Sequence, residues 1–563
     1  MAKKVSDSIV AAFSSLLASL ADSVFRARVL FVVSAVFAFF GNVDVWLASS
    51  PFSFTSFLTW LLVACLNGLF YAALAGSPWR WLRVLGYVLA VVNCLLCVVN
   101  IFSYVIYGLG IGERLFTIIT ATNAGETSAF LSSLRVSLPA FCSSPVFLSL
   151  AAVLLLSVLA VRLLPRRFFS PLALVFCLSG FVASLFCLSL EFGKRNVNMS
   201  YRSLSWSLYA HKLASHFIHT RSLRQQNIQQ STSVSSDGLC DTFVLVIGES
   251  SSRNHWSLFG YPLNTTPRLL SMRDSLFAFS DVLPPYSTTV SALGNVLSFR
   301  NSTSDTREWY FYQDIVSISR SAHFKSFWLS NQEADWNVNK LATYGVIADE
   351  ADCVQYSDAS QVIAADSQRP YDEVLLPWLA SALADTAAHK LIVLHTMGSH
   401  MEYIYRFPAS HRHFLASDEC RPGFSPERQE FTALYDNTIF YTDSLLSEMI
   451  RLVSDAPGRN ALLYVSDHSE DVFEACDFYR HAVTPELAHV PMIVYLNRPY
   501  RDAHPDFPSR LLSRQDERVA SENMIHSMLS LLGISCPEYR PVLDLLYTDY
   551  VCGNRFFEDK LVD

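Results

Sequence analysis

The sequence predicts an α-helical membrane domain of five transmembrane helices followed by an α/β domain with a mostly parallel central sheet. Hydrophobic residues make up 51% of the 563 residues, and their excess is concentrated in the first 190 positions. From Asp241 onward, short β-rich runs alternate with helical patterns, which is typical of a parallel sheet covered by helices on both faces. We therefore expect a transmembrane domain over residues 1–190, a linker over 191–239 and an outer domain over 240–563.

Five stretches of the first domain are apolar enough to cross a bilayer. They are Val29–Ala48, Phe54–Ala75, Val84–Leu109, Pro145–Val161 and Phe168–Leu190. Lys and Arg cluster before the first stretch, between the second and third, and between the fourth and fifth. Because cytoplasmic loops carry the positive charge, we expect the N-terminus in the cytoplasm and the outer domain on the opposite side. The alternative is that residues 1–22 form a cleaved signal peptide, which would reverse the later spans.

Local patterns predict the elements of the outer domain. The end of the linker, QQNIQQSTSVSSDG, has too little apolar surface to fold alone. Strands are expected at Phe243–Ile247, Ser326–Leu329, Lys390–Leu394, Leu462–Val465 and Met492–Tyr495. Helices are expected at Tyr371–Thr386, Phe431–Val453 and Ser521–Leu532.

Charge and cysteine content restrict the class of protein. The formal net charge of −8 argues against nucleic-acid binding, because phosphate contacts need concentrated Lys and Arg. The outer domain holds half of the cysteines: Cys240, Cys353, Cys420, Cys476, Cys536 and Cys552. In an oxidising compartment these would permit up to three disulfides.

Two apolar runs of the outer domain, which begin at Phe243 and Leu462, are followed directly by acidic residues and, in the second case, a histidine. Glu249 follows the first run, and Asp467 with His468 follows the second. Since open α/β sheets bind ligands at the carboxyl ends of their strands, these three side chains are candidates for one metal site. Carboxylate oxygen and imidazole nitrogen suit Zn²⁺ and also Mn²⁺. The alternative is that Glu249 caps the next helix and Asp467 is a solvated turn residue.

Four further histidines are placed near such strand ends. His395 falls within an apolar run and is expected in the interior, whereas His400 follows Gly-Ser in a loop, where an imidazole can face a ligand. His481 extends the group after the Asp-His pair. His489 directly precedes a strand, so it is either structural or a partner of a ligand.

A nucleophile is expected among the hydroxyls of one short segment, Ser287, Thr288, Thr289 and Ser291. A hydroxyl bound to a divalent cation loses its proton more easily and can attack phosphorus. The alternative is a Ser/Thr-rich turn that caps a helix over 290–299. Spacing alone does not choose among these hydroxyls.

Five motifs together resemble those of a known family. They are GES at 248–250, YSTT at 286–289, GSH at 398–400, YDN with YTD at 435–443 and SDHSE at 466–470. The family is the membrane-anchored phosphoethanolamine transferases of Gram-negative bacteria, within the alkaline phosphatase/sulfatase superfamily. The segment GESSSRNHWSLFGYPLNTTP is most similar to the branch that modifies the lipopolysaccharide core.

The resemblance covers nearly the whole chain and implies a metal-dependent enzyme. It implies a multi-pass protein of the bacterial inner membrane whose catalytic domain is sulfatase-like and lies in the periplasm. The implied reaction moves phosphoethanolamine from phosphatidylethanolamine to lipopolysaccharide (lipid A or core) or another surface glycan, through a phospho-threonine intermediate.

The resemblance also implies roles for individual residues. Glu249, Asp467 and His468 match the family's zinc ligands. The family's nucleophilic threonine lies ten residues before a phenylalanine, which places that role, and a contact with the metal, on Thr289; Thr288 is the fallback.

Four more positions are implied in substrate binding. His400 and His481 match histidines that face the phosphate or a second zinc. TNAGE at 122–126 resembles a segment that holds the lipid donor, so Thr122 and Glu126 are candidates, with an ordinary solvated loop as the alternative.

The sequence departs from the family at three points. Ser469 stands where glycine is usual, and the spacing from His468 to His481 varies among relatives. Ser287-Thr288 replaces the Cys-Gly of the lipid A branch, so the disulfide expected there is absent.

Two other functions are weighed against this one. The first is a glycerol-phosphate transferase of the lipoteichoic acid synthase kind, and the second is a non-catalytic membrane sensor with a sulfatase-like domain. A sensor would be expected to lack a ligand, and none of the matched ligands is missing. Sulfatase activity is disfavoured because the chain has no Cys-x-Pro-x-Arg signature.

Overall fold

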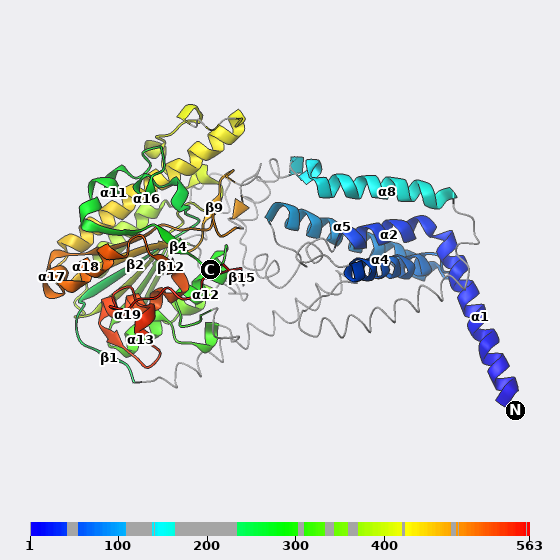
Figure 1. The fold of residues 1–563 in the computed structure, drawn as a ribbon, viewed down its shortest axis with the longest axis horizontal. Coiled ribbons are helices and arrows are strands. Elements are labelled where there is room, and N and C mark those ends of the chain that lie inside the picture. The colour runs from blue at the N-terminus through cyan, green and yellow to red at the C-terminus, as the bar shows by residue number, and fades with distance from the viewer. Residues whose placement is uncertain are drawn as a thin grey trace. The chain divides into compact units, whose positions relative to one another are not determined.

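The structure is a computed structural model. It describes residues 2–41, 54–107, 138–139, 141–163, 233–301, 309–332, 343–357, 370–418, 421, 423–474, 480–481, 484–558 and 560–562. They form two compact units (Figure 1). The described residues up to Leu163 belong to a helical unit, and those from residue 233 onward belong to an α/β unit.

The helical unit holds helices at the positions where four of the membrane spans are expected. Its helices are α1 (Ala2–Arg26), α2 (Arg28–Phe40), α4 (Phe54–Ala75), α5 (Arg80–Tyr107) and α8 (Pro145–Leu163). Helix α2 packs against α4 and α8, and α4 packs against α5.

Length and composition identify two of the described helices, Arg80–Ile106 and Pro145–Leu163, as able to cross a membrane. The pair Ala18–Arg26 and Arg28–Phe40, bent by 82°, would add a third if it forms one span. The described residues thus support two or three apolar helices rather than all five expected spans. The span expected at Phe168–Leu190 and most of the expected linker lie outside the described residues.

A seven-stranded sheet forms the centre of the α/β unit. Its order is β3 (Leu276–Phe279), β11 (Met492–Leu496), β8 (Asn460–Ser466), β2 (Thr242–Gly248), β7 (Lys390–His395), β5 (Lys325–Ser330) and β6 (Cys353–Tyr356). Each of the five strands expected from the sequence is present within two residues of its expected ends.

The sheet is mixed rather than uniformly parallel. The neighbouring strands β8, β2, β7, β5 and β6 are parallel, as the alternation of strands and helices predicts. Strand β11 runs antiparallel to both β8 and β3. Antiparallel pairing does not need a crossover helix, so the pattern of helices around β11 did not reveal its direction.

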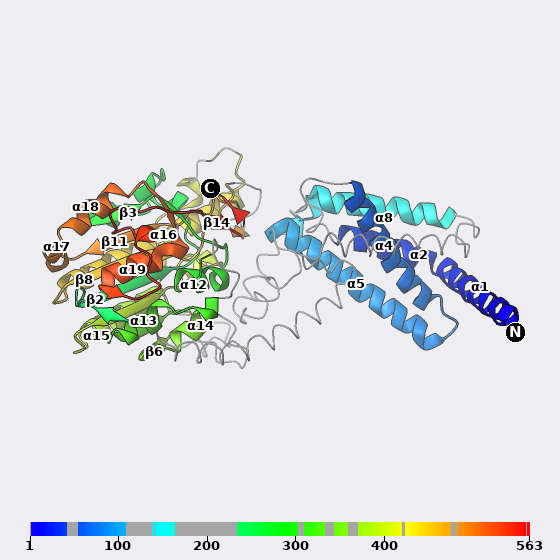
Figure 2. The same cartoon turned by 60° about the horizontal axis from the view of Figure 1, so that its bottom comes forward.

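Helices cover both faces of this sheet (Figures 1 and 2). One face carries α12 (Thr289–Val296), α13 (Ile315–Ser321), α14 (Thr343–Ala348) and α19 (Met524–Leu532), and the other carries α11 (Pro267–Ser271), α15 (Leu375–Leu383) and α16 (Pro426–Asp455). Side chains of β2 alternate between the two cores: Phe243 and Leu245 pack on the first, and Val244 and Val246 on the second. Burial on both faces explains why this strand reads as a continuous apolar run.

The smaller elements lie around the sheet. They are β1 (Ser235–Ser236) paired with β13 (Ile534–Ser535), β4 (Asp281–Leu283) with β12 (Arg518–Ala520), β9 (Glu470–Asp471) with β10 (Arg480–His481) and β14 (Phe556–Phe557) with β15 (Lys560–Leu561), together with helices α17 (Arg498–Ala503) and α18 (Asp506–Ser513). The helix expected at Tyr371–Thr386 is shorter, because a 3₁₀ turn at Asp372–Val374 precedes α15.

The upper limit of three disulfides is not reached, because four of the six cysteines of this domain are unpaired. Cys240, Cys353, Cys536 and Cys552 are free thiols. The other two cysteines of this domain, Cys420 and Cys476, lie outside the described residues.

Candidate active site

Three candidate metal ligands meet at the carboxyl edge of the sheet. Glu249 follows β2 directly, and Asp467 and His468 follow β8. Strands β2 and β8 are adjacent and parallel, and Gly248 pairs with Ser466. The two strands therefore end side by side at the same edge of the sheet. One ligand atom from each of the three residues lies within 4.8 Å of the other two, and each residue is 1% exposed.

Backbone amides and a neighbouring hydroxyl hold the two carboxylates in place. Asp467 Oδ1 accepts hydrogen bonds from the amides of Ser250 (3.1 Å) and His468 (2.7 Å). Ser250 Oγ donates to Glu249 Oε1 at 2.8 Å. Because Ser250 adopts a left-handed backbone (φ 52°), the chain turns sharply enough for its amide to reach the second strand end.

The charges of the cluster depend on one another. Burial alone would raise the pKa of Glu249, but a hydrogen bond and the charge of His468 outweigh it and lower that pKa. Burial and repulsion from Glu249 raise the pKa of Asp467. Burial opposes the charged form of His468, yet the nearby carboxylates, Asp467 foremost, raise its pKa. The two buried carboxylates can therefore be charged together only with a positive partner, which is either a proton on His468 or a cation.

The donor set fits a divalent metal. His468 Nδ1 lies 3.2 Å from the carbonyl oxygen of Ser469, an acceptor, so in the neutral ring Nδ1 carries the proton and Nε2 presents its lone pair. Nε2 lies 3.4 Å from Glu249 Oε1 and 3.5 Å from Asp467 Oδ2. Asp467 Oδ2 is buried and accepts no hydrogen bond from the described residues, which leaves it available to a cation.

The hydroxyl of Thr289 lies at this cluster. Its Oγ1 is 3.2 Å from Glu249 Oε2 and 3.4 Å from His468 Nε2. Thr289 is the first residue of α12, and the preceding N-cap residue, Thr288, makes no side-chain capping hydrogen bond. The helix N-terminus favours negative charge at this hydroxyl.

Two further residues support Glu249 and were not predicted from the sequence. Gln332 Nε2 donates to Glu249 Oε2 (3.2 Å) and to the carbonyl oxygen of Thr396 (2.9 Å). Gly398 packs against the backbone of Glu249, since a Cβ at this position would lie 2.8 Å from the Glu249 carbonyl oxygen. Gly398 belongs to the GSH motif, but the motif does not indicate this contact, and Gln332 carries no sequence signal of its own.

The loop that carries Gly398 is itself anchored by Asp372. This buried carboxylate accepts hydrogen bonds from the amides of Met397 and Gly398, each at 2.8 Å. Burial raises the pKa of Asp372, and these amides lower it in part. His400 ends the same loop, and its charge contributes to the low pKa of Glu249.

The other residues predicted from the sequence as candidates lie in different parts of the structure. His395 is fully buried at the end of β7, as expected for an interior histidine. His489 Nε2 lies 2.8 Å from Asp281 Oδ1, a contact outside the cluster. His481 lies on β10, opposite Glu470. Thr122 and Glu126 lie outside the described residues.

A second network, centred on the buried residues His255 and Asp436, lies beside the metal-ligand loops. His255 Nδ1 is 2.6 Å from Asp436 Oδ1, and its Nε2 is 2.7 Å from Glu474 Oε1. Tyr261 donates its hydroxyl to Asp436 as well. The imidazole of His255 thereby links three parts of the chain: the segment after β2, the segment after β8, and helix α16. The YDN motif pointed to Asp436, but nothing in the sequence pointed to its partner.

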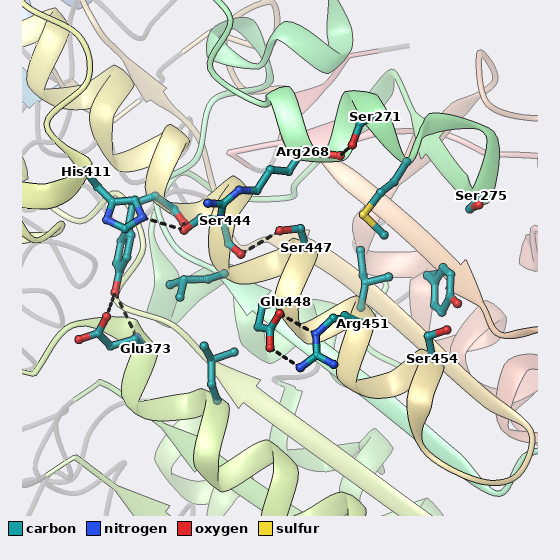
Figure 3. Close-up of a pocket in the computed structure, with 16 residues that line it drawn as sticks. Arg268, Ser271, Ser275, Glu373, His411, Ser444, Ser447, Glu448, Arg451 and Ser454 are labelled. Atoms are coloured by element: carbon teal, nitrogen blue, oxygen red, sulfur yellow. Dashed lines mark hydrogen bonds and ion pairs between the residues drawn. The ribbon is translucent and has the colours of Figure 1, made fainter.

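The pocket in Figure 3, of about 840 Å³, lies along α16 and is separate from the cluster. None of Glu249, Thr289, Asp467 and His468 lines it. The hydroxyls of Ser271, Ser444 and Ser447 donate to helix carbonyl oxygens, and Glu448 pairs with Arg451 at 2.6 Å. Several of its polar groups are thus satisfied within the protein, and none of the three candidate metal ligands reaches it.

Comparison with known proteins establishes the family. The family model described as Sulfatase matches residues 241–534. This chain therefore belongs to the sulfatase family, and the expected sulfatase-like α/β domain is confirmed.

Several relatives carry the name phosphoethanolamine transferase. The chain is 26% identical to phosphoethanolamine transferase EptC of Escherichia coli strain K12, over 88% of this chain and 90% of that protein. It is 26% identical to CptA of Salmonella typhimurium, over 86% of each chain. It is 31% identical to EptA of Helicobacter pylori, over 54% of this chain and 56% of that one.

Two solved structures extend the likeness. The C-terminal periplasmic domain of Escherichia coli EptC, crystallised with Zn, matches with a TM-score of 0.54 and 26% identity, over 59% of this chain and 95% of that domain. The integral membrane protein lipooligosaccharide phosphoethanolamine transferase A of Neisseria meningitidis matches with a TM-score of 0.60 and 20% identity, over 95% of this chain and 98% of that one. The second likeness extends the shared fold to nearly the full chain.

Proposed function

We propose that this protein is a phosphoethanolamine transferase that moves phosphoethanolamine from phosphatidylethanolamine to a lipopolysaccharide acceptor, on the core or lipid A. The relatives that this chain matches over most of their length are named phosphoethanolamine transferases. The observation that carries the proposal is the hydroxyl of Thr289, which lies within 3.4 Å of Glu249 and His468 in a buried cluster suited to a divalent metal.

We propose Thr289 as the nucleophile of the first half-reaction. Its oxygen attacks the phosphorus of phosphatidylethanolamine, the Thr289 Oγ1–P bond forms, and the bond from phosphorus to the diacylglycerol oxygen breaks. The hydroxyl proton, directed toward Glu249 at 3.2 Å, leaves with the diacylglycerol, which departs as a neutral alcohol. The N-terminus of α12 favours the negative charge that develops on the phosphoryl oxygens.

The second half-reaction returns the enzyme to its starting state. An oxygen of the acceptor attacks the same phosphorus, and the bond between phosphorus and Thr289 breaks, so that the hydroxyl is regenerated with the acceptor's proton. We assign to His400 and His481 the binding of the phosphate, assistance in proton transfer or the binding of a second zinc.

Glu249, Asp467 and His468 are the residues that would hold zinc, with Thr289 adjacent. When bound there, zinc lowers the pKa of a hydroxyl and neutralises charge on the phosphoryl group. The Zn complex of the related EptC domain supports zinc over Mn²⁺ as the metal of this chain.

The membrane arrangement is also part of the proposal. Residues 1–190 would form five spans in the inner membrane, residues 191–239 a linker, and residues 240–563 the periplasmic catalytic domain. Anchoring keeps the site at the surface where the lipid donor is concentrated, and Thr122 with Glu126 would contribute to holding that donor.

Mass spectrometry of lipopolysaccharide from cells that carry either the native protein or Thr289→Ala tests the proposal. The native protein is expected to add phosphoethanolamine to core or lipid A, and the variant is expected to add none. Addition that survives the substitution would contradict the assignment of the nucleophile. If glycerol phosphate is added instead, the protein is a glycerol-phosphate transferase, and no mass change on any glycan would favour a sensor.

A further inference from the structure

The C-terminal strand pair β14–β15 contacts the segment that leads to Thr289. Four contacts fall on every second residue of that segment. Arg555 pairs with Asp281, Phe557 packs on Leu283, the amide of Glu558 donates to the carbonyl oxygen of Pro285 (2.9 Å), and Glu558 contacts Ser287. Alternate residues of this segment, from Asp281 to Ser287, therefore contact the C-terminal residues.

The last of these contacts is the one nearest to the reacting hydroxyl. Glu558 Oε1 accepts hydrogen bonds from both the amide (2.9 Å) and the Oγ (2.8 Å) of Ser287. Ser287 is 5% exposed and lies two residues before Thr289. The backbone of Glu558 is left-handed (φ 54°), an uncommon state for a residue with a Cβ. Its amide and its carboxylate both bind the segment 285–287, so this strained residue is held from two sides.

The loop of the metal ligands contacts the same part of the molecule. Ser469 Oγ, in the position where the resembled family has glycine, donates to the carbonyl oxygen of Leu487 at 2.9 Å. Leu487 packs against the small apolar cluster of Leu283, Ala488 and Phe557. The segment before Thr289 and the loop after the metal ligands therefore both contact this apolar cluster, to which the C-terminal residue Phe557 belongs.

From these contacts we infer that Glu558 is a positioning residue for Thr289. Its carboxylate fixes the backbone at Ser287 so that the hydroxyl two residues later stays within reach of Glu249 and His468. The inference depends on the proposed function in one respect, namely that Thr289 is the nucleophile.

The experiment uses the full-length protein in detergent, with phosphatidylethanolamine in the micelles and diacylglycerol release as the readout. Glu558→Ala removes both hydrogen bonds, whereas Glu558→Gln keeps an acceptor oxygen of the same reach. We expect Glu558→Ala to lower kcat at least tenfold with KM changed less than twofold, and Glu558→Gln to recover most of the rate. The matched control is Glu517→Gln, an exposed carboxylate of the same domain, which should leave the rate unchanged.

Two additional measurements separate positioning from general stability. Zinc content and the melting temperature of Glu558→Ala should stay close to the native values. The double variant Ser287→Ala with Glu558→Ala should be no slower than Glu558→Ala alone, because both changes remove the same contact. Hydrogen exchange of the amides at 286–292 should rise in Glu558→Ala, whether or not the protein is active.

The possible outcomes distinguish failure of the inference about Glu558 from failure of the proposed function. An active native protein whose Glu558→Ala variant is equally fast overturns the inference and leaves the proposed function intact. The inference is also overturned if Glu558→Ala loses zinc, thermal stability and rate in parallel, since Glu558 would then be structural. A native protein that releases no diacylglycerol overturns the proposed function and with it the catalytic role of this contact. The hydrogen-exchange measurement would still show whether Glu558 fixes the backbone near Ser287.

Discussion

The hydroxyl of Thr289 lies 3.2 Å from Glu249 Oε2, although the two residues are 40 positions apart in the chain. The contact exists because β2 ends at the same sheet edge that the N-terminus of α12 approaches. It joins a nucleophile candidate to a metal-ligand candidate and distinguishes Thr289 from the other hydroxyls of its segment.

We predict that Thr289→Ala abolishes the covalent intermediate while zinc stays bound. Glu249, Asp467 and His468 still supply three ligand atoms, whereas no oxygen remains to attack phosphorus. Intact-protein mass spectrometry after incubation with phosphatidylethanolamine should show the added phosphoethanolamine on the native protein and on Thr289→Ser, but not on Thr289→Ala. Thr288→Ala is the matched control and should keep the adduct. An adduct on Thr289→Ala would move the nucleophile to another residue.

We predict that Gln332→Leu weakens zinc binding roughly tenfold, the lower end of the range for residues that orient metal ligands. Leucine has nearly the same volume but cannot donate to Glu249 Oε2 or to the carbonyl oxygen of Thr396. Glu249 would then lose a hydrogen bond that fixes its orientation. Competition with a chelator measures the affinity, and Gln355→Leu on the exposed face of β6 is the control. Equal affinities for Gln332→Leu and the native protein would contradict this role.

We predict that Gly398→Ala lowers both zinc content and activity. An alanine Cβ would lie 2.8 Å from the carbonyl oxygen of Glu249, and the backbone there is left-handed (φ 45°). The loop or the strand end must shift, which costs on the order of 1–3 kcal/mol and displaces a ligand. Gly423→Ala is the control, since Gly423 also has a positive φ (84°) but has no atom within 4 Å of the added Cβ. Elemental analysis should show less zinc in Gly398→Ala alone.

The elements of the α/β unit were predictable because their signals are local. The runs of Val, Leu and Ile that form β2 and β8 are buried on both faces, so their apolar pattern marks them without any tertiary information. The cluster of Glu249, Asp467 and His468 was predictable for a similar reason, since ligands at the ends of parallel strands share one edge of the sheet.

The contacts that complete the site could not be read from local patterns. Gln332 and Glu558 are single polar residues whose partners lie 83 and 271 positions away. The direction of β11 was hidden as well, because an apolar strand has the same composition whichever way it runs. Among the hydroxyls, Thr289 was chosen by resemblance, and the geometry at α12 gives a physical reason for that choice.

The stability of the catalytic domain should fall as the pH rises from about 6.5 to about 9. Both ring nitrogens of His255 face carboxylate oxygens, so the imidazole must donate from both, which only the charged form can do. Burial alone would lower the pKa of His255, but the charges of Asp436 and Glu474 raise it to about 9 from the usual 6.5. A histidine with a raised folded-state pKa stabilises the fold fully below its unfolded pKa, and this contribution is lost as the pH rises through the folded pKa.

The size of this effect follows from the shift. It amounts to about 3 kcal/mol of unfolding free energy, which urea denaturation at several pH values can measure. His255→Gln should be less stable than the native protein by about this amount near pH 6, and the difference should shrink as the pH rises from about 6.5 to about 9. The control is His323→Asn, which removes an exposed histidine at a left-handed position that asparagine tolerates. If His255→Gln and the native protein show parallel pH profiles, the imidazole is not charged in the fold, and Asp436 or Glu474 must then carry a proton.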